Sequence, residues 1–389
     1  MGSTKIEVKV NGQAYSGWTS CDVSKSIEDL CGTFSLSTQN SWADANDTPR
    51  IKAGDLVSIS MVNDKKEEYP VMFGYVDIEV PGFNNNGTFL NISGRDTTCD
   101  LVDCTLEDTF EMQGLLPVDI IKKLATEGDI TKFAIEVISN LTKEYAPYKQ
   151  NEINIDSKIA EVIKKVSSHY GFLVYTNEFG ELVLEDASVI GESVPTIEEG
   201  LNVISASRKY DLSRDYSKIR IVSQDVERPS DTNPSKNEDL NKSGEFVDKN
   251  FPRYRPLNIV HTEGTSGTVP TDRASWIKKT IQANAMEISV EMQGWTDSKG
   301  IVYKLNNQVA CDLPSLGISV VDEYMIKDIS FTMSESGGER TKLVLVHANA
   351  YNEKGRLDED EGKDKYSKEA VDYANEKLSQ RKMAEGLKK

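Results

Sequence analysis

Apolar and polar residues alternate along the start of the chain, with Ile6, Val8 and Val10 on one side of a short strand. The pair Asn11-Gly12 follows directly, and these residues favour the positive φ angles of a two-residue hairpin turn. Strand-like runs then recur at nearly regular spacing, each bounded by Gly, Asn, Asp or Pro, at 32–37, 55–61, 71–78 and 87–94. This pattern predicts an antiparallel β-barrel or sandwich in the first hundred residues.

After residue 99 the apolar spacing changes from that of a strand to that of a helix. Pro117 stands where a helix would begin, and a second helix is predicted from apolar positions at 159, 162, 163 and 166. Asp156 is expected to cap this second helix and Gly171 to end it. Two short strands within 172–184 then predict a hairpin against the helix.

Strand character returns for a second β-rich region. Its predicted strands lie at 202–207, 218–223, 325–332 and 341–346. A polar stretch at 225–250 interrupts them and predicts a long loop or the entry to an inserted domain, and a helical segment is predicted near 272–285. From residue 352 the sequence is almost wholly polar, which indicates a charged tail or an extended helix.

Composition narrows the range of functions. Lys and Arg total 45 against 63 Asp and Glu, a net charge of -18, which argues against a large surface that holds nucleic acid by neutralising phosphates. The five cysteines and three histidines lack the paired spacing of a zinc site or a disulfide framework, so we predict no metal, no cofactor and reduced thiols. Because no run is apolar enough for a signal peptide or a membrane span, we expect folding in the cytoplasm and no stable membrane association.

Several segments together resemble one known family. The segments are 10–18, 24–28, 73–77, 94–104, 294–306 and 324–331, and they cover the chain from about residue 5 to residue 351. The run Gly94-Arg95-Asp96-Thr97-Thr98 and the residues after it resemble a junction of the baseplate hub family of contractile phage tails, which includes the hubs of phage Mu and phage T4. None of these segments is catalytic, and their order and spacing carry the resemblance.

The resemblance implies an α+β, β-rich fold with two similar antiparallel tube-like β-barrel domains, a small α/β domain between them and an insertion in the second barrel. The expected boundaries are 1–98 for the first barrel, 99–198 for the α/β domain, 199–225 and 296–351 for the second barrel, 226–295 for the insertion and 352–389 for the charged tail. The run His347-Ala348-Asn349-Ala350-Tyr351 replaces the family's usual proline near the last strand, and the charged tail is additional.

The resemblance also implies a function. Three chains would form a homotrimeric ring of six similar barrels, which joins a hexameric tail tube, or its initiator protein, to a trimeric central spike. Wedge proteins and the tape measure protein are further expected partners, and DNA would pass only in transit. The expected location is the tail baseplate of the virion, assembled in the cytoplasm of the host bacterium.

Six residues are singled out as structural junction residues rather than as an active site. Arg95 with Asp96, Asp100 and Asp103 is interpreted as an Arg–carboxylate brace, although paired carboxylates beside a cation can also serve acid–base hydrolysis. Gly294 and Trp295 are assigned to a turn at the start of the segment 294–306, which resembles part of the family's second barrel.

Two other functions remain open from the sequence. The chain could be a tail protein that degrades or grips the cell envelope, in which case Asp100 or Asp103 would be needed for peptidoglycan release. Alternatively, it could be the hub of a related bacteriocin or secretion particle.

Overall fold

The structure is a computed structural model. It describes residues 5–351 except for 16, 40–50, 63–65, 86, 127, 129–130, 149–151, 154–155, 188–193, 224–242, 262–273, 276, 279–280, 282–284, 298 and 319–322. The polar stretch at 225–250 therefore falls largely outside the described residues, and the charged tail at 352–389 falls wholly outside them. By its internal contacts the chain divides into two compact units, one of residues 1–209 and 287–348 and one of residues 210–286 and 349–389.

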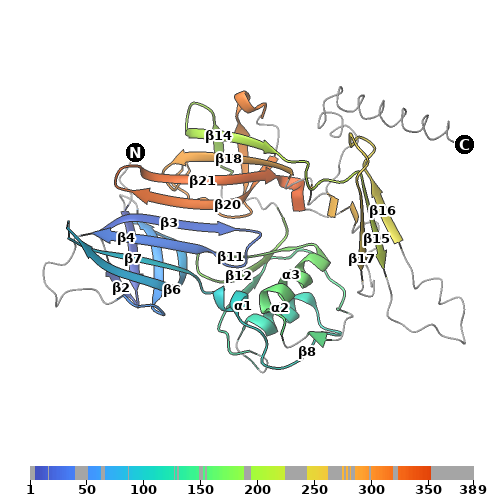
Figure 1. Ribbon diagram of the computed structural model, residues 1–389, viewed down its shortest axis with the longest axis horizontal. Helices are drawn as coiled ribbons and strands as arrows, with labels where there is room; N and C mark the ends of the chain where they lie inside the picture. The colour runs from blue at the N-terminus through green and yellow to red at the C-terminus, as the bar shows by residue number, and fades with distance from the viewer. Residues whose placement is uncertain are drawn as a thin grey trace, which may run out of the picture. The chain divides into compact units, whose positions relative to one another are not determined.

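A single large sheet dominates the first unit (Figure 1). Its strands follow one another in the spatial order β14-β18-β21-β20-β3-β4-β7-β6-β5-β1-β2, and β13 and β19 join it beside β20. The bounds are β1 Lys5–Val10, β2 Gln13–Tyr15, β3 Trp18–Ser26, β4 Thr33–Gln39, β5 Leu56–Val62, β6 Glu68–Asn84, β7 Gly87–Asp96, β13 Thr196–Glu198, β14 Val203–Tyr210, β18 Met286–Gln293, β19 Gln308–Asp312, β20 Glu323–Ser334 and β21 Gly338–His347.

The sequence pattern predicted the first strands correctly. Asn11 and Gly12 have φ angles of 50° and 81°, as a hairpin turn between β1 and β2 requires. Val8 and Val10 are buried, and β4 alternates between buried Phe34 and Leu36 and more exposed polar residues. The alternation therefore marks one face of the sheet as core and the other as solvent-facing.

The two β regions are joined rather than separate. Strand β3 of the first region pairs antiparallel with β20 of the second, from Ser26 opposite Asp328 to Ser20 opposite Ser334. Figure 1 shows these two strands running side by side. The expectation of two barrels is not met in the described residues, where no barrel closes; the edges of the two sheets pair with each other and make one continuous sheet.

Each half of the sheet nevertheless repeats the same strand order. The first half has the spatial order β3-β4-β7-β6, and the second half has the spatial order β14-β18-β21-β20. If the four strands of each half are numbered along the chain, both halves have the order first, second, fourth, third. A β-bulge also recurs: the register of β6 with β7 shifts at Asp77, and that of β20 with β21 shifts at Lys327. These eight strands thus form two four-stranded sets with the same strand order and a bulge in the corresponding strand.

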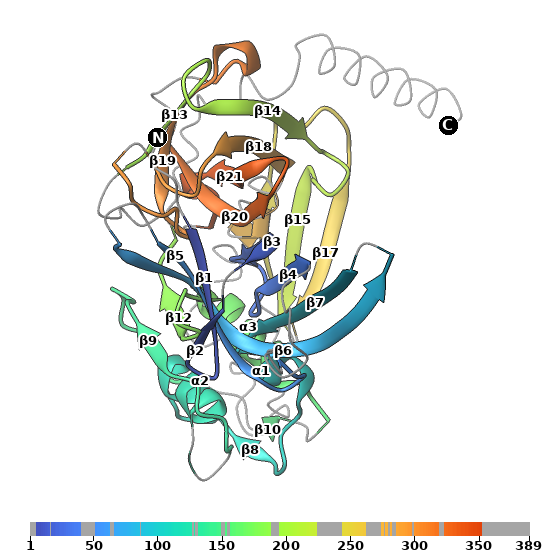
Figure 2. The ribbon, with the colours of Figure 1, turned by 90° about the vertical axis from the view of Figure 1, so that its left-hand side faces the viewer.

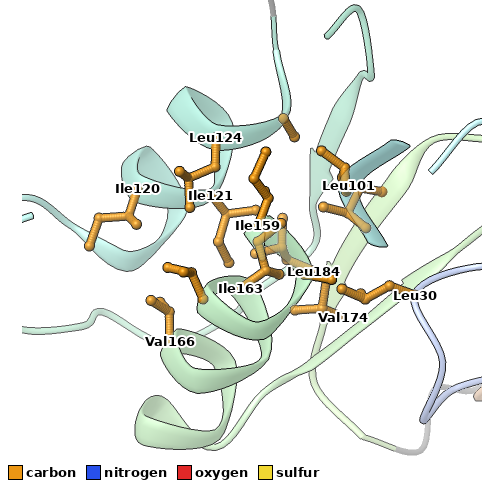
Figure 3. Close-up of a cluster of buried hydrophobic side chains, with 14 of the residues drawn as sticks. Leu30, Leu101, Ile120, Ile121, Leu124, Ile159, Ile163, Val166, Val174 and Leu184 are labelled. Carbon is orange, nitrogen blue, oxygen red and sulfur yellow. The ribbon is translucent and has the colours of Figure 1, made fainter. Parts of the chain in front are cut away.

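A helix and hairpin unit follows β7. It contains α1 Cys99–Asp103, β8 Phe110–Glu111, α2 Pro117–Ala125, β9 Val137–Ser139, β10 Glu152–Ile153, α3 Ile159–Tyr170, β11 Leu173–Thr176 and β12 Leu182–Glu185. Apolar residues of α2 and α3 meet β11, β12 and Leu30 in one core (Figure 3). Pro117 begins α2 as predicted, and Gly171 ends α3 with a φ of 74°. The expected cap by Asp156 is wrong, because α3 begins after Lys158 and its N-cap makes no side-chain hydrogen bond.

The second unit has a small sheet of its own. Strand β15 (Lys218–Ser223) lies between β16 (Ser243–Val247) and β17 (Pro256–His261), pairing antiparallel with the former and parallel with the latter. Ile219, Ile221 and Ala274 form its buried core. The fully buried Lys278 Nζ contacts carboxylates of Asp215 and Asp248, which compensates the burial of its charge.

Short 3₁₀ turns occur at Pro314–Leu316 and Ala348–Tyr351.

Candidate functional site

Arg95 links β6, β7 and α1 at the surface. Its Nε lies 2.7 Å from Asp77 Oδ2, and its Nη2 lies 2.7 Å from Asp103 Oδ2. The hydrogen bond from Arg95 lowers the pKa of Asp103 below its usual value, so Asp103 is held as a carboxylate. Because all three side chains are about one third or more exposed, the pair fixes geometry more than it adds stability.

Asp96 points into the interior, where it is fully buried. Its carboxylate accepts hydrogen bonds from the backbone N–H groups of Gly32, at 2.6 Å, and Thr98, at 3.2 Å, and from the Thr98 hydroxyl. Burial raises the pKa of Asp96 above that of a solvated carboxyl group. Three donors compensate the cost of burying this acid, which therefore ties the turn before β4 to the end of β7.

Hydroxyl groups extend this buried network into the helix and hairpin unit. Thr176 Oγ1 at the end of β11 donates to Leu30 O at 2.7 Å, and the Thr98 hydroxyl lies against the same carbonyl, so its one proton is shared between Leu30 O and Asp96. Thr97 Oγ1 donates to Gly180 O at 2.6 Å, and Lys25 Nζ donates to Asn177 O at 2.7 Å. The β11–β12 turn is thereby fastened to the first half of the large sheet.

The remaining singled-out residues lie apart from this network. No described hydrogen bond or ion pair joins Asp100 to Arg95; its Oδ1 lies 3.9 Å from Cys99 Sγ. Gly294 follows β18 with a φ of 82°, and its N–H donates to Glu339 O at 2.9 Å. Trp295 is buried, and its Nε1 donates to Thr332 O at 2.9 Å while its ring packs on Phe331. Gly294 and Trp295 thus lock β18 onto β20 and β21.

The sequence reasoning missed most of the buried partners of Asp96. Thr97 and Thr98 stood within the highlighted segment at 94–104, but no periodic signal distinguished them. Lys25 and Thr176 lie far away in sequence, and only the fold brings them to this junction. Their roles depend on tertiary contacts, for which a single sequence carries no local pattern.

The solvent-facing side of the eight strands from β14 to β6 has a distinct composition. Rows of paired residues cross it, such as Thr332, Asp22, Ser35 and Ser93 on four successive strands. Hydroxyl side chains dominate its middle: Ser20, Ser24, Thr33, Ser35, Ser37, Ser93, Ser330, Thr332 and Ser334. Its charged residues balance, with Asp22, Glu291 and Asp328 against Arg95, Arg340 and Lys342. The result is a polar face with little net charge.

Metal binding, thiol reactivity and membrane-spanning helices can each be considered for the described residues. No group of three or more His, Cys, Asp or Glu side chains among them is placed to hold a metal ion. The thiols of Cys21, Cys31 and Cys99 have pKa values raised by burial, which makes them poor nucleophiles. Within the same part of the chain, no helix combines the length and apolar character that crossing a bilayer demands.

The chain is similar to phage tail proteins both in sequence and in structure. Residues 5–96 match the N-terminal domain family of Mu phage baseplate assembly protein GpP-like. The chain is 20% identical over 351 residues to the baseplate hub protein gp44 of Escherichia phage Mu, with 88% of each protein covered. The chain is thus similar to a phage baseplate hub protein, and the resemblance noted from the sequence is confirmed.

Solved structures show the same fold. The 43 kDa tail protein of prophage MuSo2 from Shewanella oneidensis has a TM-score of 0.72 at 25% identity, over 90% of this chain and 100% of that one. The E. coli c3393 protein, a component of the type VI secretion system, has a TM-score of 0.57 at 9% identity, over 89% of this chain and 78% of that one. At that identity the second likeness concerns the fold alone.

Proposed function

We propose that the chain is a structural, non-enzymatic hub of a contractile phage-tail baseplate in which three copies form a ring. The observation that carries this proposal is the duplicated four-stranded unit with its matching bulges at Asp77 and Lys327. Three chains with two such units each present six similar surfaces. A ring of this kind matches a sixfold tube on one side and a threefold spike on the other.

The expected partners follow from that symmetry. The tail tube, or the protein that initiates it, would contact the six similar units, and the central spike would contact the three identical surfaces. Baseplate wedge proteins would surround the ring, and the location would be the baseplate of the virion. The likeness to a type VI secretion component supports a second candidate with the same role, the hub of a related secretion or bacteriocin particle.

The hydroxyl-rich face suits the wall of a conduit. DNA adheres to proteins chiefly when Lys and Arg replace its condensed counterions, so a face whose charges balance holds it weakly. We propose that this face lines the ring's channel and lets the tape measure protein and then DNA pass without binding. The acidic character of the whole chain, with its net charge of -18, supports the same role.

The junction residues and domain limits belong to this proposal as well. Arg95, Asp96 and Asp103 would hold the small α/β domain of 99–198 against the first tube-like domain of 1–98, with Asp100 on the surface of α1. Gly294 and Trp295 would hold β18 in the second tube-like domain, where the turn after β18 meets β20 and β21. The insertion would then span 211–285 instead of 226–295, because β15 belongs to the small sheet and β18 to the large one.

The oligomeric state of the purified full-length chain tests the proposal. Light scattering is expected to give a particle of three times the chain mass of 43.3 kDa, and negative-stain images are expected to show rings with an open centre. Filter binding at physiological salt should detect no retained double-stranded DNA. A chain that stays strictly monomeric at micromolar concentration would overturn the proposed ring.

A further inference from the structure

A lysine and two aspartates meet inside the second compact unit. The side chains of Lys278 and Asp215 are 0% and 1% exposed, and that of Asp248 is 13% exposed. Lys278 Nζ is in hydrogen-bond contact with Asp215 Oδ1, and it lies 3.1 Å from Asp248 Oδ2. One buried amino group therefore contacts two carboxylates from different parts of the unit.

The backbone holds each of these carboxylates in place. Asp215 precedes β15, and its Oδ1 accepts a hydrogen bond from the N–H of Tyr216 at 2.7 Å. Asp248 follows β16; its Oδ1 accepts from the N–H of Asn250 at 3.0 Å, and its own N–H donates to Ser217 O at 2.8 Å. Because the start of β15 pairs with the end of β16, both carboxylates lie at the same end of the small sheet.

Apolar groups surround the amino group of Lys278. The centroid of the Phe251 ring lies 5.0 Å from Lys278 Nζ. Ala274, four residues earlier in the chain, belongs to the core that Ile219 and Ile221 of β15 form. Figure 2 shows β15 beside β17, whose Leu257 and Ile259 pack against that core. The ion pair is thus held out of water, where separating charges from their hydration is costly.

Condensation of the amino group with a carboxyl group would remove both charges. An ammonium and a carboxylate give an uncharged amide and one water molecule, so the desolvation cost of the ion pair ends when the bond forms. A nitrogen in contact with a carboxylate oxygen lies about 3 to 3.5 Å from the carboxyl carbon, the separation of a near-attack arrangement. Holding two groups in this way corresponds to an effective concentration on the order of 10⁵ to 10⁸ M.

We propose that Lys278 Nζ forms an isopeptide bond with Asp215 Cγ and that Asp248 serves as the acid–base group. One proton first passes from the ammonium group to the Asp215 carboxylate, which gives a neutral amine and a carboxylic acid. The Nζ lone pair then forms the Nζ–Cγ bond. Asp248 takes a second proton from Nζ and passes it to the hydroxyl group on Cγ, and the Cγ–O bond breaks as water leaves. The amide nitrogen keeps one hydrogen, and Asp248 ends as the carboxylate that it was.

The surroundings of the two acids distinguish their roles. Asp215 is in direct contact with the amine and is the more deeply buried acid, which suits the residue that is consumed. Asp248 lies farther from Nζ and is partly exposed, so it can exchange protons with solvent. Tyr216 O accepts a hydrogen bond from Lys278 Nζ at 2.7 Å and orients the amine between them.

The bond would close the second unit near its base. The chain enters this unit at Tyr210 and leaves its first stretch at Met286, and the N–H of Asp211 donates to Ala285 O at 2.7 Å beside these ends. Residues 215 and 278 lie a few positions further in, so a pull on the two ends would be carried by a covalent bond instead of by the small sheet. The cross-link would also restrict the unfolded chain over about sixty residues. This covalent clamp does not depend on the proposed hub function.

Mass spectrometry of the denatured full-length chain tests the bond. The chain mass of 43.3 kDa should be lower by one water molecule. After digestion, fragmentation should identify a branched peptide in which Lys278 is joined to Asp215. A full mass together with two separate peptides would overturn the proposal.

Lysine variants locate the reacting amine. Lys278→Arg keeps the positive charge but lacks the amino group, so this variant should have the full mass of its own sequence. Lys218→Arg is the matched control, because Lys218 forms an exposed ion pair with Glu245 at 2.6 Å on the same sheet and should not affect the loss of water. Loss of water that persists in Lys278→Arg would show that other residues react and would overturn the assignment.

Asp248→Asn tests the acid–base role. The amide cannot carry the proton from Nζ to the leaving oxygen, so the bond should form roughly 100-fold more slowly or less. Most of the freshly purified variant should then have the full mass, while circular dichroism shows that it is folded. A folded variant that links as fast as the unaltered chain would overturn the role given to Asp248.

Limited proteolysis gives an independent reading that does not depend on exact mass. Trypsin cleavage between residues 215 and 278 should leave two fragments that stay joined on a denaturing, reducing gel. The same cleavage of Lys278→Arg should give two separate fragments. Fragments that separate in the unaltered chain would refute the clamp and leave the hub proposal standing, whereas a monomeric chain with joined fragments would do the reverse.

Discussion

Asp77 and Lys327 hold equivalent bulge positions in the two halves of the large sheet but carry opposite charges. Asp77 binds Arg95 of its own half at 2.7 Å. Lys327 Nζ lies 2.8 Å from Glu287 of its own half and 3.3 Å from Glu28, which follows β3 in the other half. The pairing of β3 with β20, which forms the seam between the two halves, is therefore secured by a largely buried cation, whereas Asp77 makes its ion pair within its own half.

Replacing Lys327 should weaken that seam. Lys327→Met removes the nearest cation from the partly buried Glu287, which keeps only the longer contact to Lys209, and from the exposed Glu28. We expect a loss of about 2 kcal/mol in unfolding free energy. Chemical denaturation followed by tryptophan fluorescence measures the change. Lys342→Met, at an exposed position of β21, is the matched control and should stay within about 0.5 kcal/mol. Equal effects of the two variants would contradict the role given to Lys327.

Glu339 should make stability depend on pH. Burial raises the pKa of Glu339 to about 7, so between about pH 4.5 and 7 the folded chain holds a proton that the unfolded chain releases. This contribution is present at low pH and is lost as pH rises through that window.

Because Glu339 is only half-buried, the loss is on the order of 1 kcal/mol. Glu339→Gln should flatten this part of the stability profile, measured by denaturation from pH 4 to 8. A profile that keeps its slope in the variant would show that another group titrates there.

Asp96 should matter more for stability than any other residue of the junction. Asp96→Ala leaves the buried N–H groups of Gly32 and Thr98 without an acceptor, which should cost about 3 kcal/mol. Asp96→Asn keeps one acceptor oxygen and should cost less. Amide exchange at 176–181 reports whether the hairpin loosens. Asp100→Ala, which breaks no described bond to Arg95, serves as the control and should leave both readings unchanged.

Gly94 should not tolerate a side chain. A Cβ atom there would lie 1.9 Å from Tyr75 O and 2.7 Å from Phe34 Cζ, where β6 and β7 cross closely beside the bulge. Gly94→Ala should therefore destabilise the chain by about 3 kcal/mol or more, as thermal unfolding would show. Gly128→Ala meets nothing closer than 3.9 Å and should be nearly neutral, so a comparable loss in both variants would refute the steric argument.

The sequence predicted turns and helix ends correctly where the backbone preferences of neighbouring residues agreed. The Asn11-Gly12 hairpin, the start of α2 at Pro117 and the end of α3 at Gly171 all follow from backbone preferences that a few neighbouring residues determine. Asp156 failed as a cap because α3 begins two residues later than its position implied. Helix ends depend on such small shifts, which apolar spacing does not resolve.

Contacts between residues far apart in the sequence could not be predicted from it. Pairing of β3 with β20 joins residues some three hundred positions apart, and its seam is made of backbone hydrogen bonds between mostly small polar residues. Nothing in either strand marks the other as its partner, so separate barrels were expected where one sheet exists. Arg95 and Asp103 were recognised together because only a turn and α1 separate them, whereas Asp77 was not.

The seam between β3 and β20 also bears on how such chains evolve. Five of its residues, Ser20, Ser24, Ser26, Ser330 and Ser334, are serines, and the join itself is made by the main chain, which every amino acid except proline supplies alike. Substitutions there leave the backbone hydrogen bonds between β3 and β20 intact, so the side chains are under little selective constraint. Sequences can then diverge to 25% identity while the fold persists, as in the prophage MuSo2 tail protein.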